Sequence, residues 1–328
     1  MSYKISLIIP VYKTEKFIEK CLLSVCNQTL EKFEIIIIDD CSPDRSLDVV
    51  KKVLHQYPER AKHTKIISFN VNHGISYVRK YALDIANGEY IASLDSDDYL
   101  EPYALEELLN NARENSADIV FSDYYINESR IQRVIRQEPP SSIDETIKNL
   151  LEDRLHGSLC NKLFKKDILD KVCILEGVNM SEDLLISIQA LFYCSKVSYL
   201  PIPCLHYVKC NPNSYTTVFS QNKIDQMVKG VIFIENFFKE NNVLYKFNDS
   251  LNLRKVIIKS DAISYSEGNF LEKNTKLFEK SLSNMIYDKR INFYKNLLHI
   301  STKFNFLSLV NLIIKIRRNI KKVQGMCK

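Results

Sequence analysis

Apolar runs and helical spacings alternate through the first 125 residues. Continuous apolar runs, which suit strands buried on both faces, occur at five places: 5–10, 34–40, 65–69, 90–95 and 118–123. Apolar residues at helical spacing fall between them: 15–27, 47–54, 75–87 and 102–114. We expect the third helix to stop at Gly88 and the fourth to begin at Pro102. Strands separated by helices of this length predict right-handed βαβ units and a parallel sheet.

This alternation ends after Tyr125. In the following residues we expect an edge strand at 130–136, a loop at 138–142 and helices at 143–155 and 181–194. Strands around two prolines are expected at 197–208. Beyond Gln221 the patterns are helical: 221–241, 249–266, 270–287 and 303–322. We therefore predict an α/β domain over 1–218, in the halves 1–125 and 126–218, followed by a helical region over 219–328.

Charge and glycine content narrow the possible functions. The 45 Lys and Arg residues exceed the 40 Asp and Glu residues, for a net charge of +5. Ten of these basic residues lie in 289–328, which has no acid, so the first 288 residues are net negative. The seven glycines are never closer than fourteen positions. This spacing excludes both common glycine-rich phosphate loops.

Cysteine usage and hydropathy bear on the compartment. The nine cysteines form no C-x-x-C pair, and several lie in apolar runs, as is typical of a reducing compartment. The apolar run before Pro10 is short for a signal peptide. No uncharged run reaches the roughly 18 apolar residues that a membrane span needs. We expect a cytoplasmic protein.

Acidic side chains follow the predicted strands at the point where each strand ends. Ligands of open parallel sheets bind beyond these carboxyl ends. Asp95 and Asp97 are two positions apart, so in an extended segment their carboxylates point the same way. Two such oxygen donors suit Mg²⁺ or Mn²⁺ shared with a diphosphate. Any one of these acids could be an ordinary turn or cap residue. Five unneutralised carboxylates at one rim would repel one another, so the set as a whole favours a binding site. The five are Asp39, Asp40, Asp95, Asp97 and Asp98.

Several segments in order resemble inverting, family 2 type glycosyltransferases with the GT-A fold. The similarity covers about residues 4–210 and rests on four segments: PVYKTEKFIEKCLLSVCNQTLEKFEIIIIDDCSPDRS, NHGISYVRKYALDIANGEYIASLDSDDYLEP, NKLFKKDIL and MSEDLLI. The resemblance implies a mainly parallel sheet flanked by helices. It also implies that 1–125 binds a nucleotide sugar and that 126–218 binds the acceptor.

The resemblance assigns a base pocket to the first strands. Pro10, Tyr12 and Asp40 would line it, with Tyr12 stacking on the ring and Asp40 accepting from the pyrimidine N–H. Asp39 would support the same loop, or could simply cap the strand end. Family members often have glycine where Cys41 stands, a change that the turn can survive.

The resemblance also assigns the diphosphate and metal contacts. Asn72 and Arg79 match an N-x-G-x-S-x-x-R segment, and Arg79 would face the diphosphate, a role that its fixed charge suits. A surface position on the helix is the alternative for Arg79. Asp95 would bind the ribose or a metal-bound water, and Asp97 would bind Mn²⁺ or Mg²⁺.

Asp183 is the candidate catalytic residue. A structural role could explain this residue completely. Ser181 can cap the following helix, and the helix dipole favours an acid such as Asp183 in the first turn. The family's E-D motif instead implies that Asp183 removes the proton of the acceptor hydroxyl as it attacks the anomeric carbon. General bases of this kind contribute about 10²–10⁴-fold.

Three further residues stay open. Many family members carry a Tyr-Arg pair and a downstream Ser that fold over the diphosphate. In this sequence Lys209 lies one place away from the position of that pair, and Ser214 follows it. His206 could be a metal ligand, or a histidine with its hydrogen bonds satisfied on a strand. Lys162 marks the floor of the acceptor side.

The basic C-terminal segment predicts a helix with an apolar stripe. The stripe is Phe304, Leu307, Val310, Ile313, Ile314 and Ile320. Such a helix lies in an anionic membrane interface or packs against the rest of the chain. Nucleic acid binding is not expected, because no signature for it is present.

These observations predict a metal-dependent glycosyltransferase that acts on a saccharide or lipid-linked acceptor. The resemblance implies that its nucleotide sugar is a UDP-sugar. The enzyme would act at the inner face of the cell membrane. The alternatives are a sugar-phosphate nucleotidyltransferase and a non-catalytic nucleotide-sugar-binding protein.

Overall fold

A computed structural model describes residues 3–128, 131–209, 211, 220–266, 270–282, 287–304, 306 and 308–316. The chain divides into two compact units, Met1–Thr217 and Val218–Lys328. Each unit is described by itself.

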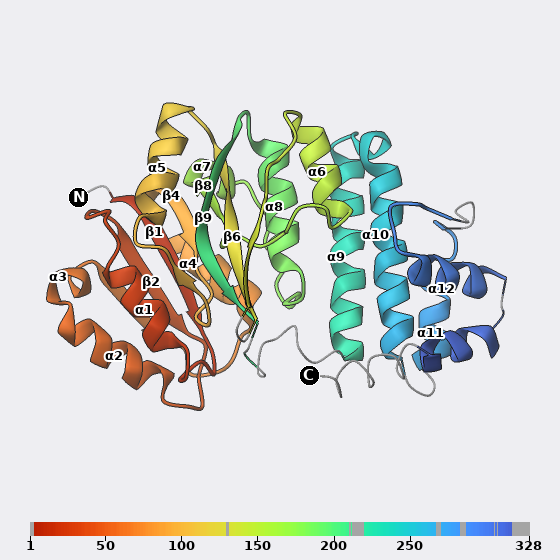
Figure 1. Ribbon diagram of the computed structural model, residues 1–328, viewed down its shortest axis with the longest axis horizontal. Helices are drawn as coiled ribbons and strands as arrows, with labels where there is room; N and C mark the ends of the chain where they lie inside the picture. Colours follow the sequence, from red (N-terminus) through yellow and green to blue (C-terminus); the bar gives the residue numbers. More distant parts are fainter. Residues whose placement is uncertain are drawn as a thin grey trace. The chain divides into compact units, whose positions relative to one another are not determined.

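The first unit contains one sheet of nine strands among its described residues (Figure 1). The strands are β1 (Tyr3–Val11), β2 (Glu34–Asp39), β3 (Thr64–Ser68), β4 (Gly88–Ser93), β5 (Tyr99–Leu100), β6 (Ile119–Glu128), β7 (Ile131–Ile135), β8 (Lys162–Lys165) and β9 (Val197–Val208). Their order is β3-β2-β1-β4-β8-β6-β9-β5, and β7 pairs with β6. The strands β3, β2, β1 and β4 are mutually parallel, as the sequence predicts.

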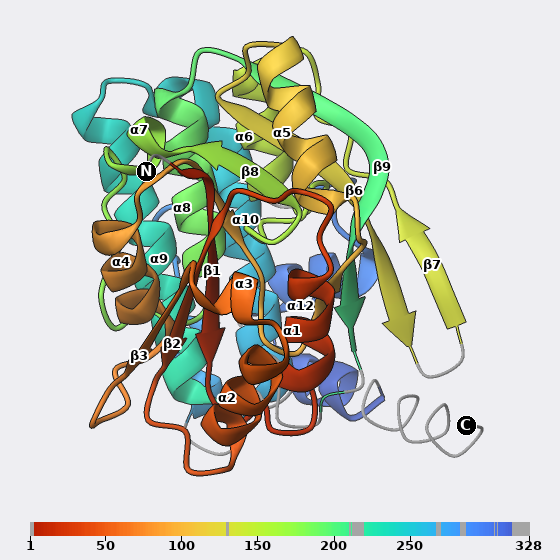
Figure 2. The same cartoon turned by 90° about the vertical axis from the view of Figure 1, so that its left-hand side faces the viewer.

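The second half of the sheet is mixed. Strand β8 runs antiparallel to both β4 and β6, and it therefore separates two strands of the same direction. Strand β9 is parallel to β6, with register shifts beside Asp123 that accommodate Pro201 and Pro203 in one continuous strand. The hairpin partner β7 is the predicted edge strand (Figure 2).

Helices cover both faces of this sheet. They are α1 (Ile18–Cys26), α2 (Ser46–Gln56), α3 (Pro58–Ala61), α4 (Ile75–Ile85), α5 (Ala104–Glu114), α6 (Ile143–Leu151), α7 (Lys166–Leu169) and α8 (Glu182–Tyr193). Alternate residues of β1, such as Ile5, Leu7 and Ile9, share a buried cluster with α1, α2 and α5. Ile8 and Ile91 point to the other face, where they line a cavity with residues of α4, α7 and α8. Because both faces are covered, the first strands are continuously apolar.

Two of the predicted helix signals work differently in the structure. Helix α4 ends at Ile85, and Gly88 begins β4 instead of capping the helix. A Cβ on Gly88 would lie 2.4 Å from the backbone nitrogen of Ser6, so glycine permits the close pairing of β4 with β1. Pro102 lies in a turn, and α5 begins two residues later, at Ala104.

The second unit is helical. Its helices are α9 (Gln221–Glu240), α10 (Leu244–Tyr265), α11 (Phe270–Thr275) and α12 (Phe293–Lys303), and residues 308–316 are also helical. Helices α9 and α10 pack side by side (Figure 1). The Phe238 and Phe247 rings, whose centroids are 4.5 Å apart, join them. The helix expected over 270–287 is much shorter, because turns follow Thr275. Helix α12 was not predicted.

Part of the predicted apolar stripe is packed within the second unit, whereas Phe304 is exposed. Val310, Ile313 and Ile314 are buried in a cluster with Ile263 of α10 and Leu298 of α12. The predicted stripe is therefore wrong as a membrane face in these positions, because it forms the helix's packing face. Leu307 and Ile320, which were also assigned to the stripe, lie outside the described residues.

Candidate functional site

The loop after β2 is organised by two buried carboxylates. Asp39 accepts hydrogen bonds from the backbone of Ser42 (3.1 Å) and the hydroxyl of Ser68 (2.9 Å). Asp40 accepts from the backbone N–H groups of His73 (2.7 Å) and Gly74 (2.8 Å). Each carboxylate thus joins its own loop to the end of β3 or to the residues that follow it. These carboxylates hold the rim of the sheet in one shape.

The neighbouring backbone has the conformations that this rim requires. Cys41, where family members often have glycine, has a φ of 59° in the left-handed region. Asn72 is exposed and donates to the backbone oxygen of Asp40 (3.0 Å). Gly74, with a φ of 86°, is approached by Asn179, whose Oδ1 also accepts from the backbone of Ser76 (3.1 Å). Asn179 is more than a hundred positions from the N-x-G-x-S segment in the sequence, so the fold brings these two parts of the chain into contact.

Pro10 and Tyr12 lie at the end of β1. Pro10 is buried within the strand opposite Ile38 of β2. The Tyr12 side chain is 42% exposed, and the Lys13 ammonium lies 5.1 Å from its ring centroid. Of the residues expected in the base pocket, Tyr12 presents an accessible ring face, while Pro10 and Asp40 support the surface around it.

A tight acidic turn follows β4. The backbone N–H of Asp98 donates to the carbonyl of Asp95 (2.9 Å), which closes the turn. Asp97 accepts from the Asn211 amide (2.8 Å), and Asp98 accepts from the backbone of Val208 (2.8 Å). The end of β9 and the residues just after it therefore hold this turn. Asp98 is 2% exposed, so it supports the turn from within.

The electrostatics of this turn favour a cation. Burial, the largest effect, raises the pKa of Asp97, and Asp95 raises it further, against the hydrogen bond from Asn211. Burial also raises the pKa of Asp98 well above its usual range, with contributions from Asp97 and Asp95. A positive ion beside Asp97 would relieve this repulsion.

The donor set fits a hard divalent cation that keeps several positions open. Among the described residues, no three His, Cys, Asp or Glu side chains gather closely enough to hold a metal by themselves. Mg²⁺ and Mn²⁺ are commonly bound by one or two carboxylates, with substrate phosphates and waters completing the shell. Asp97, with Asp95 beside it, provides this kind of partial site.

Arg79 lies in the interior and not on the surface. It is 5% exposed, and its guanidinium donates to Glu182 (3.2 Å), Ser93 (3.0 Å) and Asp95 (3.1 Å). Burial alone would lower the pKa of Arg79, but Asp95 and Glu182 outweigh it and raise the pKa. Each of the three guanidinium nitrogens donates to a protein group, which uses three of the five N–H donors, and the expected contact with a diphosphate stays a prediction. Arg79 joins the acidic turn to α8.

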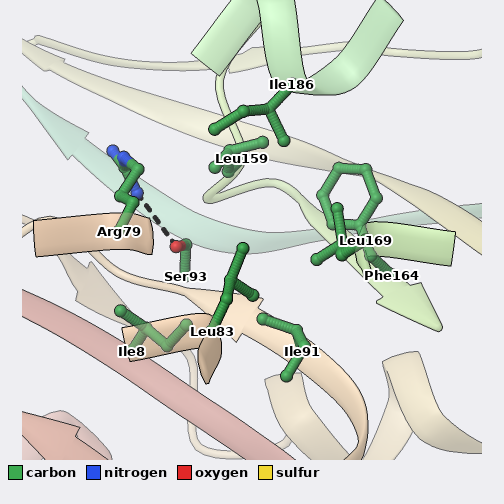
Figure 3. A pocket seen from close by; sticks show the side chains of 9 residues that line it. All are labelled: Ile8, Arg79, Leu83, Ile91, Ser93, Leu159, Phe164, Leu169 and Ile186. Atoms are coloured by element: carbon green, nitrogen blue, oxygen red, sulfur yellow. Dashed lines mark hydrogen bonds between the residues drawn. The ribbon is translucent and has the colours of Figure 1, made fainter. Parts of the chain in front are cut away.

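A small cavity of about 10 Å³ lies behind Arg79. Its lining is apolar except for Arg79 and Ser93, which are hydrogen-bonded to each other at one end (Figure 3). This volume is at the lower limit for one water molecule, so it cannot be the substrate site. The cavity lies in the interior between the sheet, α4, α7 and α8.

The first turn of α8 carries the two acids of the E-D pair. Ser181 has a φ of 69°, and its side chain makes no cap hydrogen bond, so the expected capping by Ser181 is wrong. Burial raises the pKa of Glu182 to about 8, with Asp183 adding to the rise and Arg79 opposing it. The half-buried Asp183 carboxylate accepts from the backbone of Leu184 (2.7 Å). Glu182 is thus bound in the interior by Arg79, whereas the Asp183 carboxylate is partly exposed.

Sequence reasoning missed the supporting residues of this site. Glu182 and Asn179 could have been suspected from their position around the E-D pair, but their partners lie 103 residues away. His206 is a histidine with satisfied hydrogen bonds: Nε2 lies 2.8 Å from Glu101, and the ring stacks between Tyr99 and Tyr125. Lys209 forms an ion pair with Glu128 (2.7 Å). The downstream serine, Ser214, lies outside the described residues.

Comparisons with known proteins give a consistent result. Residues 6–173 match the family model described as glycosyl transferase family 2. The chain is similar to EpsH of Bacillus subtilis (strain 168), with 29% identity over 84% of this chain and 80% of EpsH. It is also similar to the poly(ribitol-phosphate) beta-glucosyltransferase of Bacillus spizizenii, with 35% identity over 60% of this chain and 30% of that protein.

Solved structures share the fold. S. aureus TarS 1–349 in complex with UDP-GlcNAc has a TM-score of 0.67 at 19% identity, over 96% of this chain and 92% of that one. The mannosyltransferase PcManGT from Pyrobaculum calidifontis, in complex with GDP-Man and Mn²⁺, has a TM-score of 0.52 at 13% identity, over 97% and 87%.

Proposed function

This chain belongs to glycosyl transferase family 2, and we propose that it transfers a sugar from a UDP-sugar to a hydroxyl of a saccharide or lipid-linked acceptor, with inversion. The observation that carries the proposal is the buried Arg79, which joins the acidic turn at Asp95 to the Glu182-Asp183 pair of α8. A donor-side turn and a candidate base are thereby held in one framework. Family membership favours this function over the nucleotidyltransferase and the non-catalytic binding protein.

On the donor side, we assign the base pocket to the rim formed by Pro10, Tyr12, Asp39, Asp40 and Asn72. The exposed Tyr12 ring would stack on the base. Asp40 already accepts one backbone hydrogen bond on each oxygen, and a carboxylate oxygen can accept a second from the base N–H. The UDP-GlcNAc complex of TarS, a protein with the same fold, supports uracil as the base.

Asp95 and Asp97 would bind the diphosphate end of the donor through a divalent cation. Mn²⁺ or Mg²⁺ at Asp97 would neutralise the diphosphate and stabilise it as a leaving group. Arg79 would act as a positioning residue, because its buried guanidinium orients Asp95.

Asp183 would act as the general base. Its carboxylate accepts the proton of the acceptor hydroxyl while the hydroxyl oxygen forms a bond to the anomeric carbon. The bond from that carbon to the diphosphate oxygen breaks on the opposite face, and UDP leaves with the bonding electron pair. One displacement of this kind inverts the anomeric configuration.

The second unit offers a surface for an anionic membrane. Exposed apolar side chains lie on and before the last described helix: Phe304, Phe306, Leu309, Leu312 and Ile316. They occur in the segment 289–328, which carries ten basic residues and no acid. An apolar face beside basic residues suits the interface of an anionic bilayer. No described helix is long and apolar enough to cross the bilayer. From the exposed apolar side chains and the basic segment we propose peripheral binding at the cytoplasmic face, where surface polysaccharide would be assembled.

The experiment that tests the catalytic assignment is the Asp183→Asn variant. We would measure UDP release from UDP-glucose, UDP-galactose and UDP-N-acetylglucosamine with Mn²⁺, where water serves as a slow acceptor, and UDP binding by calorimetry. We expect Asp183→Asn to lose about 10²–10⁴-fold in rate with unchanged UDP affinity. Asp170→Asn, an exposed acid paired with Lys166, is the matched control. Full activity in Asp183→Asn would exclude it as the base.

A further inference from the structure

Lys162, the first residue of β8, has a buried ammonium group. Its side chain is among the largest fully buried ones. The Nζ atom donates to the carbonyls of His156 (2.8 Å) and Ser158 (2.5 Å) and to the side-chain oxygen of Asn161 (2.9 Å). Among the residues that the structure describes, no carboxylate lies within ion-pair distance of it. An ammonium has three N–H groups, so these three oxygens use all of them.

Two of the three acceptors belong to a segment that packs on α8. The carbonyl of Gly157, between His156 and Ser158, accepts from the Ser187 hydroxyl (2.9 Å). A Cβ on Gly157 would lie 3.0 Å from the Cβ of Leu184. Leu184 and Ser187 are one and four positions after Asp183. The segment 156–158 is thus held by Lys162 on one side and by the turn that carries Asp183 on the other.

We propose that Lys162 is a positioning residue: its ammonium fixes the segment 156–158 against the first turns of α8, and so orients Asp183 toward the acceptor. This inference rests on the proposed role of Asp183 as the base. Lys162 itself, fully buried, does not contact the substrate.

The charge of Lys162 makes this contact sensitive to pH. The groups that face the ammonium are Asp183 on α8, Cys160 and His156 on the adjoining segment, and the Phe121 ring of β6 (4.8 Å). Burial, the largest effect, lowers the pKa of Lys162 to about 7, and Asp183 and Cys160 oppose it. A neutral amine donates only two hydrogen bonds. One of the three contacts is therefore lost as the pH rises through this value.

The test compares Lys162→Met with Lys165→Met, a partly exposed lysine of the same strand that pairs with Asp167. UDP release from UDP-glucose, UDP-galactose and UDP-N-acetylglucosamine with Mn²⁺ would be measured from about pH 6 to about pH 9, with UDP binding by calorimetry. We expect kcat of the wild type to exceed that of Lys162→Met by about tenfold at the low end. The ratio should fall severalfold toward the high end, where one of the three contacts is lost, with unchanged UDP affinity, and Lys165→Met should match the wild type throughout.

Two further variants keep the outcomes distinct. Ser187→Ala releases the segment from α8 without touching the buried charge, and we expect a severalfold loss of kcat with unchanged UDP affinity. If Lys162→Met does not fold by circular dichroism, Ser187→Ala decides, and a wild-type kcat there overturns the inference. The inference is also overturned if the ratio of wild-type kcat to Lys162→Met kcat equals one, or if that ratio does not change with pH. Full activity in Asp183→Asn would instead refute the proposed function.

Discussion

The guanidinium of Arg79 on α4 lies 3.2 Å from the carboxylate of Glu182 on α8, although 103 positions separate the two residues in the sequence. The same guanidinium lies 3.1 Å from Asp95 in the turn after β4. One buried cation therefore links the two acidic segments that the proposed reaction needs. Burial, the largest effect, and the neighbouring Asp183 raise the pKa of Glu182 despite this contact.

Removing this cation should destabilise the fold. Arg79→Met leaves Glu182 and Asp95 without their buried partner, and breaking a buried ion pair from one side costs about 3–5 kcal/mol. Urea unfolding should show this loss. The adjacent Lys80, exposed and paired with Glu176, provides the control: Lys80→Met should leave the unfolding midpoint unchanged. Equal effects of the two variants would contradict the central role of Arg79.

Asp97 should control metal-dependent donor binding. In Asp97→Asn, calorimetry should show UDP affinity in Mn²⁺ reduced by at least about tenfold, the smaller end of what perturbed metal sites lose. Without metal, wild type and variant should bind UDP equally weakly. Asp167→Asn, a change at an exposed acid, should behave as wild type. Wild-type binding that does not respond to Mn²⁺ would argue against a metal at this turn.

Glu34 should make the fold sensitive to acid. Burial opposes its ionised form, but hydrogen bonds from Ser6, the Asn87 backbone and Lys65 outweigh burial and lower the pKa of Glu34. Its folded pKa is thus below its unfolded pKa, so the stability it contributes is present above the unfolded value and is lost as the pH falls through the folded one.

The comparison that checks this is the thermal midpoint of Glu34→Gln against wild type. The difference should be largest near neutral pH and should disappear in acid, below the ordinary pKa of 4.5. Glu89→Gln, at a half-exposed surface position on β4, serves as the control and should show no such trend. A difference that is independent of pH would mean that Glu34 acts by shape alone.

The exposed leucines of the last described helix should determine membrane binding. Leu309→Ser combined with Leu312→Ser should reduce partition into phosphatidylglycerol vesicles by more than about tenfold, because burying one leucine side chain is worth about 1.5–3 kcal/mol. Phosphatidylcholine vesicles should bind both proteins weakly. Ile131→Ser, at an exposed position on β7, is the control. Unchanged sedimentation of the double variant with anionic vesicles would refute this face as the contact.

Much of the fold could be predicted, because local periodicity reports which side of an element is buried. The alternation through residue 125 predicted β1 to β4 and their helices, since both faces of those strands are covered. The short strands β5 and β8 were not predicted, because two or four residues carry no period and gain their stability from pairing. Helix α12 was missed for another reason: the residues it buries are mostly polar, so they leave no apolar period.

The sequence by itself determined the family resemblance, the acidic turn at Asp95 and Asp97, and the position of Asp183 in the first turn of a helix. The tertiary structure alone decided that Arg79 is buried against Glu182, that Lys162 supports the segment beside α8, and that Val310 and Ile313 are packed while Leu309 and Leu312 are exposed. The physical reason is common to all three. A side chain's burial and charge partners depend on residues that fold beside it from far along the chain, and spacing within one element cannot encode them.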